Sequence, residues 1–305
     1  MVKNRALNAT SGCRPKAAGS AAPVPPMTHE VAFGYPRDFL SNQFVYLVIS
    51  PRANGLSIGL NINPAGACNL NCQYCEVDRD QHQPPTRLNV ARMTMELGET
   101  LELAQGGWLR QWPRYAKLPE ELLKVRHVAL SGDGEPTLSP DFLDATRAVV
   151  QLRHSGRFFK IVLVTNATAL DCPPVQAGLE LLSQRDEIWA KLDGGTEDYV
   201  NMVNGSKVSL EKILANILLV GRHRPVVIQS LFPEIRGEEP PQSEIEEYAL
   251  RLKELKASGA EIPLVQIYSA TRPMARSGCG HLPLKVLFEI AQTVRHVAGL
   301  HAEVY

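Results

Sequence analysis

Residues 67–75 have the sequence ACNLNCQYC, which spaces Cys68, Cys72 and Cys75 as CxxxCxxC. Three thiolates this close in sequence can bind three irons of a [4Fe–4S] cube and leave the fourth iron without a protein ligand. The triplet comes directly after the apolar-rich segment Leu56–Ile62, which is typical of a buried strand. The spacing therefore predicts an iron–sulfur cluster on a loop that follows a strand.

Other uses of the three cysteines stay open on spacing alone. Structural zinc usually takes four Cys or His ligands in paired spacings, and a disulfide framework needs an even number of cysteines in a short secreted chain. His82 could supply a fourth zinc ligand, and a redox-only role is a further alternative. The spacing nevertheless favours iron–sulfur.

The triplet resembles that of the radical S-adenosylmethionine (SAM) superfamily, in which the open iron chelates the amino and carboxylate groups of SAM. The resemblance implies two cofactors, a [4Fe–4S] cluster held by the three cysteines and SAM. Tyr74 matches the aromatic residue that usually precedes the third cysteine in this superfamily and tends to lie beside the adenine.

A second motif, SGDGEPTL at residues 131–138, follows the predicted strand Val125–Leu130 and resembles the GGEP segment of the superfamily. Gly132 and Gly134 let backbone come close to a ligand, and Pro136 favours an extended residue before it. We expect a bulky residue at position 134 to weaken SAM binding while the thiolates keep their iron. An ordinary strand-to-helix turn is the alternative. The SAM contacts predicted from this segment are Gly132, Asp133, Gly134, Glu135 and Pro136.

Two further predicted strands end in polar side chains. Thr165 and Asn166 close one of them in the form that this superfamily often shows, and we expect both at the cofactor. Lys191 and Asp193 close the next, and alternation along a strand puts both on one face. Polar groups at the carboxyl ends of barrel strands are positioned for a ligand. We predict Lys191 and Asp193 as catalytic residues, with a structural salt bridge as the alternative.

The last two predicted strands carry four candidates for contacts with the ribose and adenine of SAM. The alternative is that these residues are only polar caps of barrel strands. They are Gln229, Ser230, Gln266 and Tyr268. Cys279, in a glycine-rich loop, could donate a hydrogen atom to a substrate radical or bind a metal with His281, or it has no role. Arg272 suits a substrate carboxylate or phosphate.

Predicted strands and helices alternate after residue 56, which indicates a parallel sheet built from βα repeats. Right-handed crossovers would curl it into an open barrel with the strand-end motifs on one rim. We predict an α/β fold, a partial (β/α)6 TIM-like barrel of the radical SAM core type. The predicted strands are Ser57–Ile62, Val125–Leu130, Phe159–Thr165, Glu187–Leu192, Val226–Leu231 and Leu264–Tyr268. The predicted helices are Met93–Ala104, Pro140–Leu152, Pro174–Ser183, Leu210–Val220, Ser243–Lys256 and Leu284–Ala298.

The composition fits one enzyme domain, because 305 residues with 44% hydrophobic content can bury a large core. Residues 1–27 lack periodicity and the apolar h-region of a signal peptide, so we predict a disordered leader over 1–27 and the core domain with an N-terminal extension over 28–305. No apolar run reaches the length of a membrane span. Six cysteines indicate a reducing compartment, and we expect the cytoplasm.

The stretch from Phe44 to Tyr305 is also similar to short radical SAM proteins grouped with the tRNA wyosine-base synthases. Those synthases carry a second cluster on three upstream cysteines, whereas only Cys13 lies upstream here. We therefore expect one cluster, and wyosine chemistry is disfavoured.

The resemblance implies a radical SAM enzyme that cleaves SAM reductively and generates a 5′-deoxyadenosyl radical. This radical would abstract hydrogen from an unidentified substrate, which we expect to be a small molecule or peptide. An electron donor such as flavodoxin or ferredoxin is the expected partner. The alternatives are a tRNA-modifying wyosine-synthase-like enzyme and a non-catalytic iron–sulfur electron carrier or sensor. Equal numbers of basic and acidic residues, 32 of each, give no electrostatic footprint for nucleic acid.

Overall fold

A computed structural model describes residues 39–77, 87–271 and 278–305 of the chain. All of these residues fall within the compact unit Ala32–Tyr305. The predicted leader at 1–27 lies outside the described residues, as do Cys13, His82 and Arg272, and the predictions made for them stay predictions.

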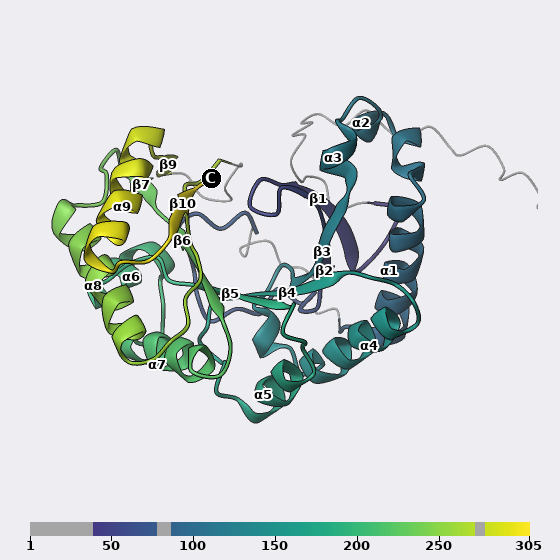
Figure 1. The fold of residues 1–305 in the computed structure, drawn as a ribbon, viewed down its shortest axis with the longest axis horizontal. Helices are drawn as coiled ribbons and strands as arrows, with labels where there is room; N and C mark the ends of the chain where they lie inside the picture. The colour runs from purple at the N-terminus through teal and green to yellow at the C-terminus, as the bar shows by residue number, and fades with distance from the viewer. Residues whose placement is uncertain (1–38, 78–86, 272–277) are drawn as a thin grey trace, which may run out of the picture. The chain divides into compact units, whose positions relative to one another are not determined.

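An eight-stranded sheet organises this unit, with the strand order β1-β2-β3-β4-β5-β6-β8-β10. From β2 to β10 every neighbouring pair is parallel, and β1 runs antiparallel to β2. The sheet curls, and the helices lie along its convex side (Figure 1). This arrangement confirms the predicted α/β half-barrel. The six predicted strands are β2 (Gly55–Asn61), β3 (Val125–Ser131), β4 (Lys160–Thr165), β5 (Glu187–Lys191), β6 (Val226–Leu231) and β8 (Val265–Tyr268).

Four short or peripheral strands add to the predicted set. β1 (Val45–Ser50) forms a hairpin with β2 through the turn at residues 51–54, and β10 (Ala302–Val304) extends the far edge beside β8. β7 (Pro233–Ile235) and β9 (Cys279–His281) form a separate antiparallel pair. Three-residue strands are too short to show a hydrophobic period, which is why sequence patterning did not find β7, β9 and β10.

Six helices match the predicted ones and begin at recognisable signals. Asn89 caps α1 by accepting a hydrogen bond from Arg92 N at 3.0 Å, Ser209 caps α7, and Pro173 starts α5. These helices are α1 (Val90–Gln105), α4 (Phe142–His154), α5 (Pro173–Glu180), α7 (Leu210–Gly221), α8 (Gln242–Ala257) and α9 (Leu284–Val297). The unpredicted ones are α2 (Pro113–Ala116), α3 (Glu120–Leu123) and α6 (Glu197–Asn204), with 3-10 turns at Trp108–Gln111 and Pro136–Leu138. No helix in the described ranges is both long and apolar enough to cross a bilayer.

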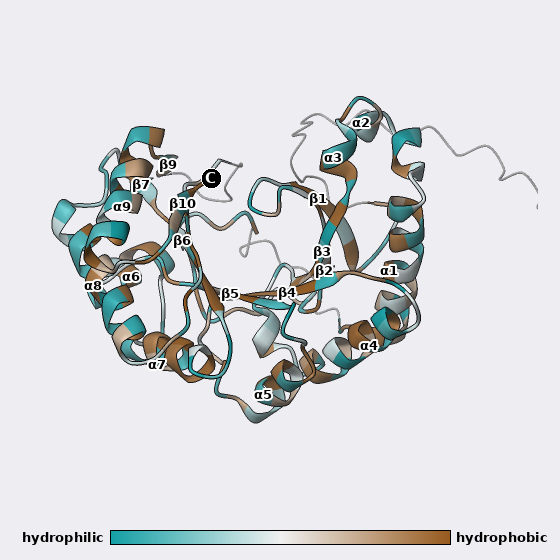
Figure 2. Cartoon of the chain, viewed as in Figure 1, coloured by the Kyte–Doolittle hydropathy of each residue, from teal (hydrophilic) through white to brown (hydrophobic). Residues whose placement is uncertain are grey.

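The two faces of the sheet differ in chemistry. Residues such as Ile188 and Ile228 face the helices and belong to the main hydrophobic core, which explains the hydrophobic strands in Figure 2. On the concave face, Val162, Trp189 and Val227 form a small separate apolar cluster. Because side chains alternate along a strand, the polar residues in register with this cluster also face the concave side. That face is therefore the one equipped to receive a polar ligand.

Candidate functional site

The loop that carries the cysteines lies between β2 and α1, and backbone hydrogen bonds connect it to other segments. Asn71 N donates to Asn204 O at 2.7 Å, and Gln73 N donates to Val203 O at 2.8 Å. At the start of the loop, Ala67 O accepts a hydrogen bond from Glu135 N at 2.9 Å. The three thiols are half-buried. Contacts from two distant segments therefore hold the loop beside the carboxyl ends of the strands.

Two buried amides point at the thiol sulfurs. Asn166 Nδ2 lies 3.7 Å from Cys68 Sγ, and Asn204 Nδ2 lies 3.3 Å from Cys72 Sγ. Burial raises the pKa of Cys72 to about 11, Asp193 adds to the rise, and the Asn204 amide opposes it. A thiol with this pKa is protonated at neutral pH when no cation is bound. N–H donors toward sulfur are the usual outer contacts of metal-bound thiolates.

The donor set of the cysteine loop fits a [4Fe–4S] cube. Among the described residues, no three Cys, His, Asp or Glu side chains gather as closely as the ligands of one metal ion would. In a cube each thiolate binds a different iron, so its ligands stand further apart. Three partly accessible thiols stand on one loop, with amides aimed at two of them, and this donor set is the kind that holds a [4Fe–4S] cube. The zinc alternative stays a prediction, because its proposed fourth ligand, His82, lies outside the described residues.

Asp193 is the centre of a buried network next to the cysteine loop. Its Oδ2 accepts hydrogen bonds from Asn204 Nδ2, at 2.8 Å, and from the Tyr74 hydroxyl. Its Oδ1 accepts from Leu231 N at 2.8 Å and forms an ion pair with Lys191 Nζ at 3.2 Å. The predicted Lys–Asp pair is therefore a salt bridge that also anchors the aromatic residue of the triplet.

Lys191 joins this network to the sixth predicted strand. Its ammonium donates to the Tyr268 hydroxyl at 3.1 Å and lies 5.0 Å from the centre of the Tyr74 ring. Burial opposes the charge of Lys191, but Asp193 and Tyr268 outweigh that effect and raise the pKa of the ammonium. Burial raises the pKa of Tyr74, with Asp193 as the next cause. Lys191 is therefore protonated and Tyr74 is a neutral donor at physiological pH.

The SGDGEP segment packs directly onto the cysteine loop. A Cβ at Gly134 would meet Ala67 O at 2.4 Å, and a Cβ at Gly132, whose φ is +135°, would meet Asn61 Oδ1 at 2.2 Å. Asp133 N donates to the same Asn61 Oδ1 at 3.1 Å. The close approach at Gly134 therefore serves the loop that starts at Ala67. A larger residue there would disturb the cysteines as well as SAM, which revises the expectation that iron binding is spared.

Glu135 is buried and hydrogen-bonded to the residues at the ends of β3 and β4. Its carboxylate accepts from Thr165 Oγ1 at 2.6 Å, from Asn166 N at 2.8 Å and from Thr137 Oγ1 at 2.7 Å. Burial raises the pKa of Glu135 even though these bonds act to lower it. The residue is extended before Pro136, as predicted, but its N–H is bonded to Ala67 and its carbonyl accepts from Asn63 Nδ2 at 2.8 Å. Thr165 and Pro136 thus hold Glu135 in place.

Four other predicted site residues do not all lie on the concave face of the main sheet. Gln229 Nε2 donates to Gln266 Oε1 at 3.0 Å on the concave face. Ser230 Oγ instead bonds Leu192 O at 2.6 Å and the Tyr248 hydroxyl of α8, so it faces the helices and supports no contact from the concave side. Cys279 lies in β9, opposite Ile235 of the separate two-stranded sheet. The pKa of the Cys279 thiol is raised first by burial and then by the charge of Glu234. The structure therefore groups Gln229, Gln266 and Tyr268 but not Ser230 or Cys279.

Sequence reasoning did not find Asn204 or Asn61. Asn204 ends α6, and the signals that could have found this helix are its cap, Thr196, which accepts from Tyr199 N at 3.3 Å, and Gly205 in the left-handed conformation. Asn61 ends β2, where a polar residue closing an apolar strand is the same signal that identified Thr165 and Asn166.

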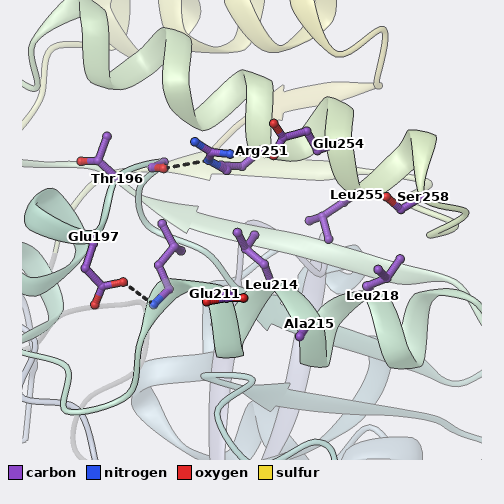
Figure 3. A pocket seen from close by; sticks show the side chains of 12 residues that line it. Thr196, Glu197, Glu211, Leu214, Ala215, Leu218, Arg251, Glu254, Leu255 and Ser258 are labelled. Atoms are coloured by element: carbon purple, nitrogen blue, oxygen red, sulfur yellow. Dashed lines mark hydrogen bonds and ion pairs between the residues drawn. The ribbon is translucent and has the colours of Figure 1, made fainter.

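A pocket of about 580 Å³ lies on the helical side, between α7 and α8 (Figure 3). Its floor includes Leu214, Leu218 and Leu255, and Arg251 at its edge donates to Gly195 O at 3.2 Å. None of the predicted site residues lines it. The candidate site is therefore defined by converging side chains and not by this pocket.

The profile of the Radical SAM superfamily matches residues 62–243, more than half of the chain. No curated protein matches the sequence significantly. A solved structure of TYW1 with a lysine-pyruvate adduct bound is 19% identical, with 80% of this chain and 74% of that chain covered and a TM-score of 0.50. Streptococcus suis SuiB bound to S-adenosylmethionine is 16% identical, with 83% and 49% covered and a TM-score of 0.51. A spore photoproduct lyase mutant with bound AdoMet and dinucleoside spore photoproduct is 10% identical, with 85% and 78% covered and a TM-score of 0.53. At these identities the likeness shows the fold alone.

Proposed function

The chain belongs to the radical SAM superfamily, whose enzymes use a [4Fe–4S] cluster and SAM, and from this premise we propose that Cys68, Cys72 and Cys75 hold the cluster. When bound, the two cofactors supply reductive cleavage of the S–C5′ bond and a 5′-deoxyadenosyl radical that takes a hydrogen atom from substrate. The observation that carries the assignment is the convergence of the Asn166 and Asn204 amides on Cys68 and Cys72.

The strand-end residues would bind and orient SAM. Gly132, Gly134 and Asn166 stand at the ends of β3 and β4, beside the loop that carries the cysteines. Glu135 is occupied in holding Thr165 and Asn166, so its role is to fix this edge. Tyr74, held by Asp193, presents its ring for the adenine. Gln229, Gln266 and Tyr268 supply polar groups on the concave face.

The Lys191–Asp193 pair positions the site. Asp193 holds Tyr74, Asn204 and the backbone of Leu231 at once, and the Lys191 ammonium balances its buried charge. An unpaired carboxylate at this depth would be costly, because burial removes the water that stabilises it. We assign no proton transfer to either residue. The pair keeps the geometry that the radical step requires.

The substrate is a small molecule or peptide, and an external electron donor of the flavodoxin or ferredoxin type supplies the reductant. Two features support this choice over tRNA. The 32 basic and 32 acidic residues leave no net charge for a polyanion. The polar side chains that meet at the strand ends lie on the concave face of a half-barrel, where a compact ligand is surrounded more readily than a folded RNA.

Anaerobic reconstitution tests this proposal. We expect about four irons and four sulfides per chain, and slow conversion of SAM to methionine and 5′-deoxyadenosine after reduction with dithionite. Replacing any cysteine of the triplet by Ala should abolish both. Cys172→Ala is the matched control, because Cys172 is an exposed cysteine at the start of α5. A cluster that survives loss of Cys72 would overturn the ligand assignment. SAM that stays intact and changes no cluster spectrum would favour the electron-carrier alternative.

A further inference from the structure

Arg52 occupies an unusual position in the turn between β1 and β2. Its guanidinium lies over the ring of Tyr268, 4.1 Å from the ring centre, so it reaches across to the opposite side of the half-barrel. Its Nε is buried and has no hydrogen-bond acceptor among the described residues. A buried donor without a partner is costly in a native protein, and the cost is larger for a charged group. The Arg52 Nε–H is therefore a donor for which the described residues supply no acceptor.

The other charged groups near this face already have partners. Lys191 pairs with Asp193 at 3.2 Å, and Lys160 pairs with Glu187 at 2.7 Å. Within the described part of the chain, Arg52 forms no ion pair with a carboxylate, and its guanidinium lies over the Tyr268 ring. Its charge also opposes the rise in the pKa of the Tyr305 hydroxyl. After burial and Lys160, its charge is the third cause that lowers the pKa of His127. The positive charge of Arg52 is therefore felt at His127 and at Tyr305.

Hydrogen bonds support the backbone of the turn that carries Arg52. Arg126 Nε donates to Asn54 O at 2.8 Å, and Ala53 N donates to Ser50 Oγ at 3.2 Å. Asn54 adopts a φ of +52° and the next residue, Gly55, a φ of +151°, which fixes a sharp return into β2. A supported turn presents a side chain with less loss of conformational entropy on binding than an unsupported one.

We propose that the concave face binds an oxyanion of the substrate, a carboxylate or phosphate, through Arg52, with Lys191 and Tyr268 beside it. This inference rests on the proposed function, because it assigns the chemistry of the molecule from which hydrogen is taken. A guanidinium offers a planar pair of donors that matches either oxyanion, and it is more weakly hydrated than an ammonium. The Lys191 ammonium lies 5.3 Å from the centre of the Tyr268 ring, so two cations approach the same aromatic residue. The resemblance to the superfamily implies that the carboxylate of SAM would bind the open iron, and on that basis the anion at Arg52 would belong to a second molecule.

The test uses full-length reconstituted protein and titrates inorganic phosphate or acetate by calorimetry, without reductant. We expect saturable binding in the millimolar range for at least one anion. Arg52→Gln should weaken it about tenfold or more, and Arg52→Lys should restore part of the loss, because charge returns without the paired donors. Arg147→Gln is the matched control, since Arg147 is an exposed arginine on α4 that pairs with Asp144. Iron content and circular dichroism check that each variant is folded.

The two anions identify the substrate class. Tighter phosphate binding indicates a phosphate ester, and tighter acetate binding indicates a carboxylate. The inference is overturned if neither anion saturates, if Arg52→Gln binds as well as the wild type, or if saturating SAM displaces the anion. The last result would assign the site to the carboxylate of SAM itself. Binding requires no turnover, so wild-type protein that cleaves SAM but binds no anion refutes only this inference. Protein that binds the anion but never cleaves SAM refutes only the proposed function.

Discussion

Replacing Asn204 by Leu should lower the reduction potential of the cluster. Leu has nearly the same shape as Asn but no N–H groups, so the substitution removes the donor that lies 3.3 Å from Cys72 Sγ. Reduction adds negative charge to the cluster and its thiolates, and a hydrogen bond to sulfur stabilises that charge. Without the donor, the reduced state is disfavoured relative to the oxidised state.

The size of the shift follows from the strength of one bond. A net contribution of about 0.5–1.5 kcal/mol, at about 1.4 kcal/mol and 59 mV per tenfold change for one electron, gives a decrease of about 20–60 mV. The same amide donates to Asp193 Oδ2 at 2.8 Å. Losing a hydrogen bond to that carboxylate should reduce the free energy of unfolding by about 1.5–3 kcal/mol.

An EPR-monitored redox titration of reconstituted protein without SAM measures the potential, and urea unfolding measures the stability. Asn201→Leu provides the control on the same helix, because Asn201 is exposed and its side chain donates to Glu197 Oε1 at 3.4 Å. The reasoning fails if Asn204→Leu has the potential of the control, or a higher one, while the protein stays folded and loaded with iron.

Three further predictions concern other parts of the structure. Gly134→Ala should lose iron as well as SAM binding, because its Cβ would meet Ala67 O at 2.4 Å. Gly98→Ala is the control, since the nearest atom to a Cβ at Gly98 is 3.9 Å away, and iron analysis of both variants tests the prediction. Burial, followed by the charges of Lys160 and Arg52, lowers the pKa of His127 from 6.5 to about 3. As the pH falls below 6.5 the unfolded chain therefore binds the proton while the folded protein does not, and the free energy of unfolding decreases. The loss is about 2 kcal/mol by pH 5, and urea unfolding at pH 7 and pH 5 should show a smaller difference in His127→Gln. Protein lacking residues 1–27 should bind total tRNA weakly in filter assays, and tight, salt-dependent binding that unrelated RNA does not compete would restore the tRNA alternative.

Periodicity predicted the parallel strands because each is buried against helices and is long enough to show its pattern. The cysteine triplet and the strand-end polar residues predicted most of the candidate site for a related reason, since parallel strands bring their carboxyl ends to one edge. Alternation could also have separated Gln229 from Ser230, because adjacent residues of a strand face opposite sides. The structure places Ser230 against Tyr248 in accordance with that rule.

Contacts between distant segments were beyond the reach of sequence patterns. Asn204 meets Cys72 across 132 positions, and it lies on a helix of only eight residues. The reach of Arg52 to Tyr268 depends on the curvature of the whole sheet, which no local pattern encodes. Both residues became candidates only when their neighbours in space were known.

The backbone anchors of the cysteine loop bear on how the protein acquires and keeps its metal. Asn71 and Gln73 are bonded to the end of α6, and Ala67 is bonded to Glu135, through contacts that contain no iron. Fixing the backbone of a single residue costs roughly 1–2 kcal/mol of conformational entropy. Because the loop is ordered when the chain folds, most of this entropy is lost during folding and not when the cluster is inserted. A cluster lost to oxygen could then be rebuilt on a standing scaffold, and repair would be limited by the supply of iron and sulfide instead of by refolding of the chain.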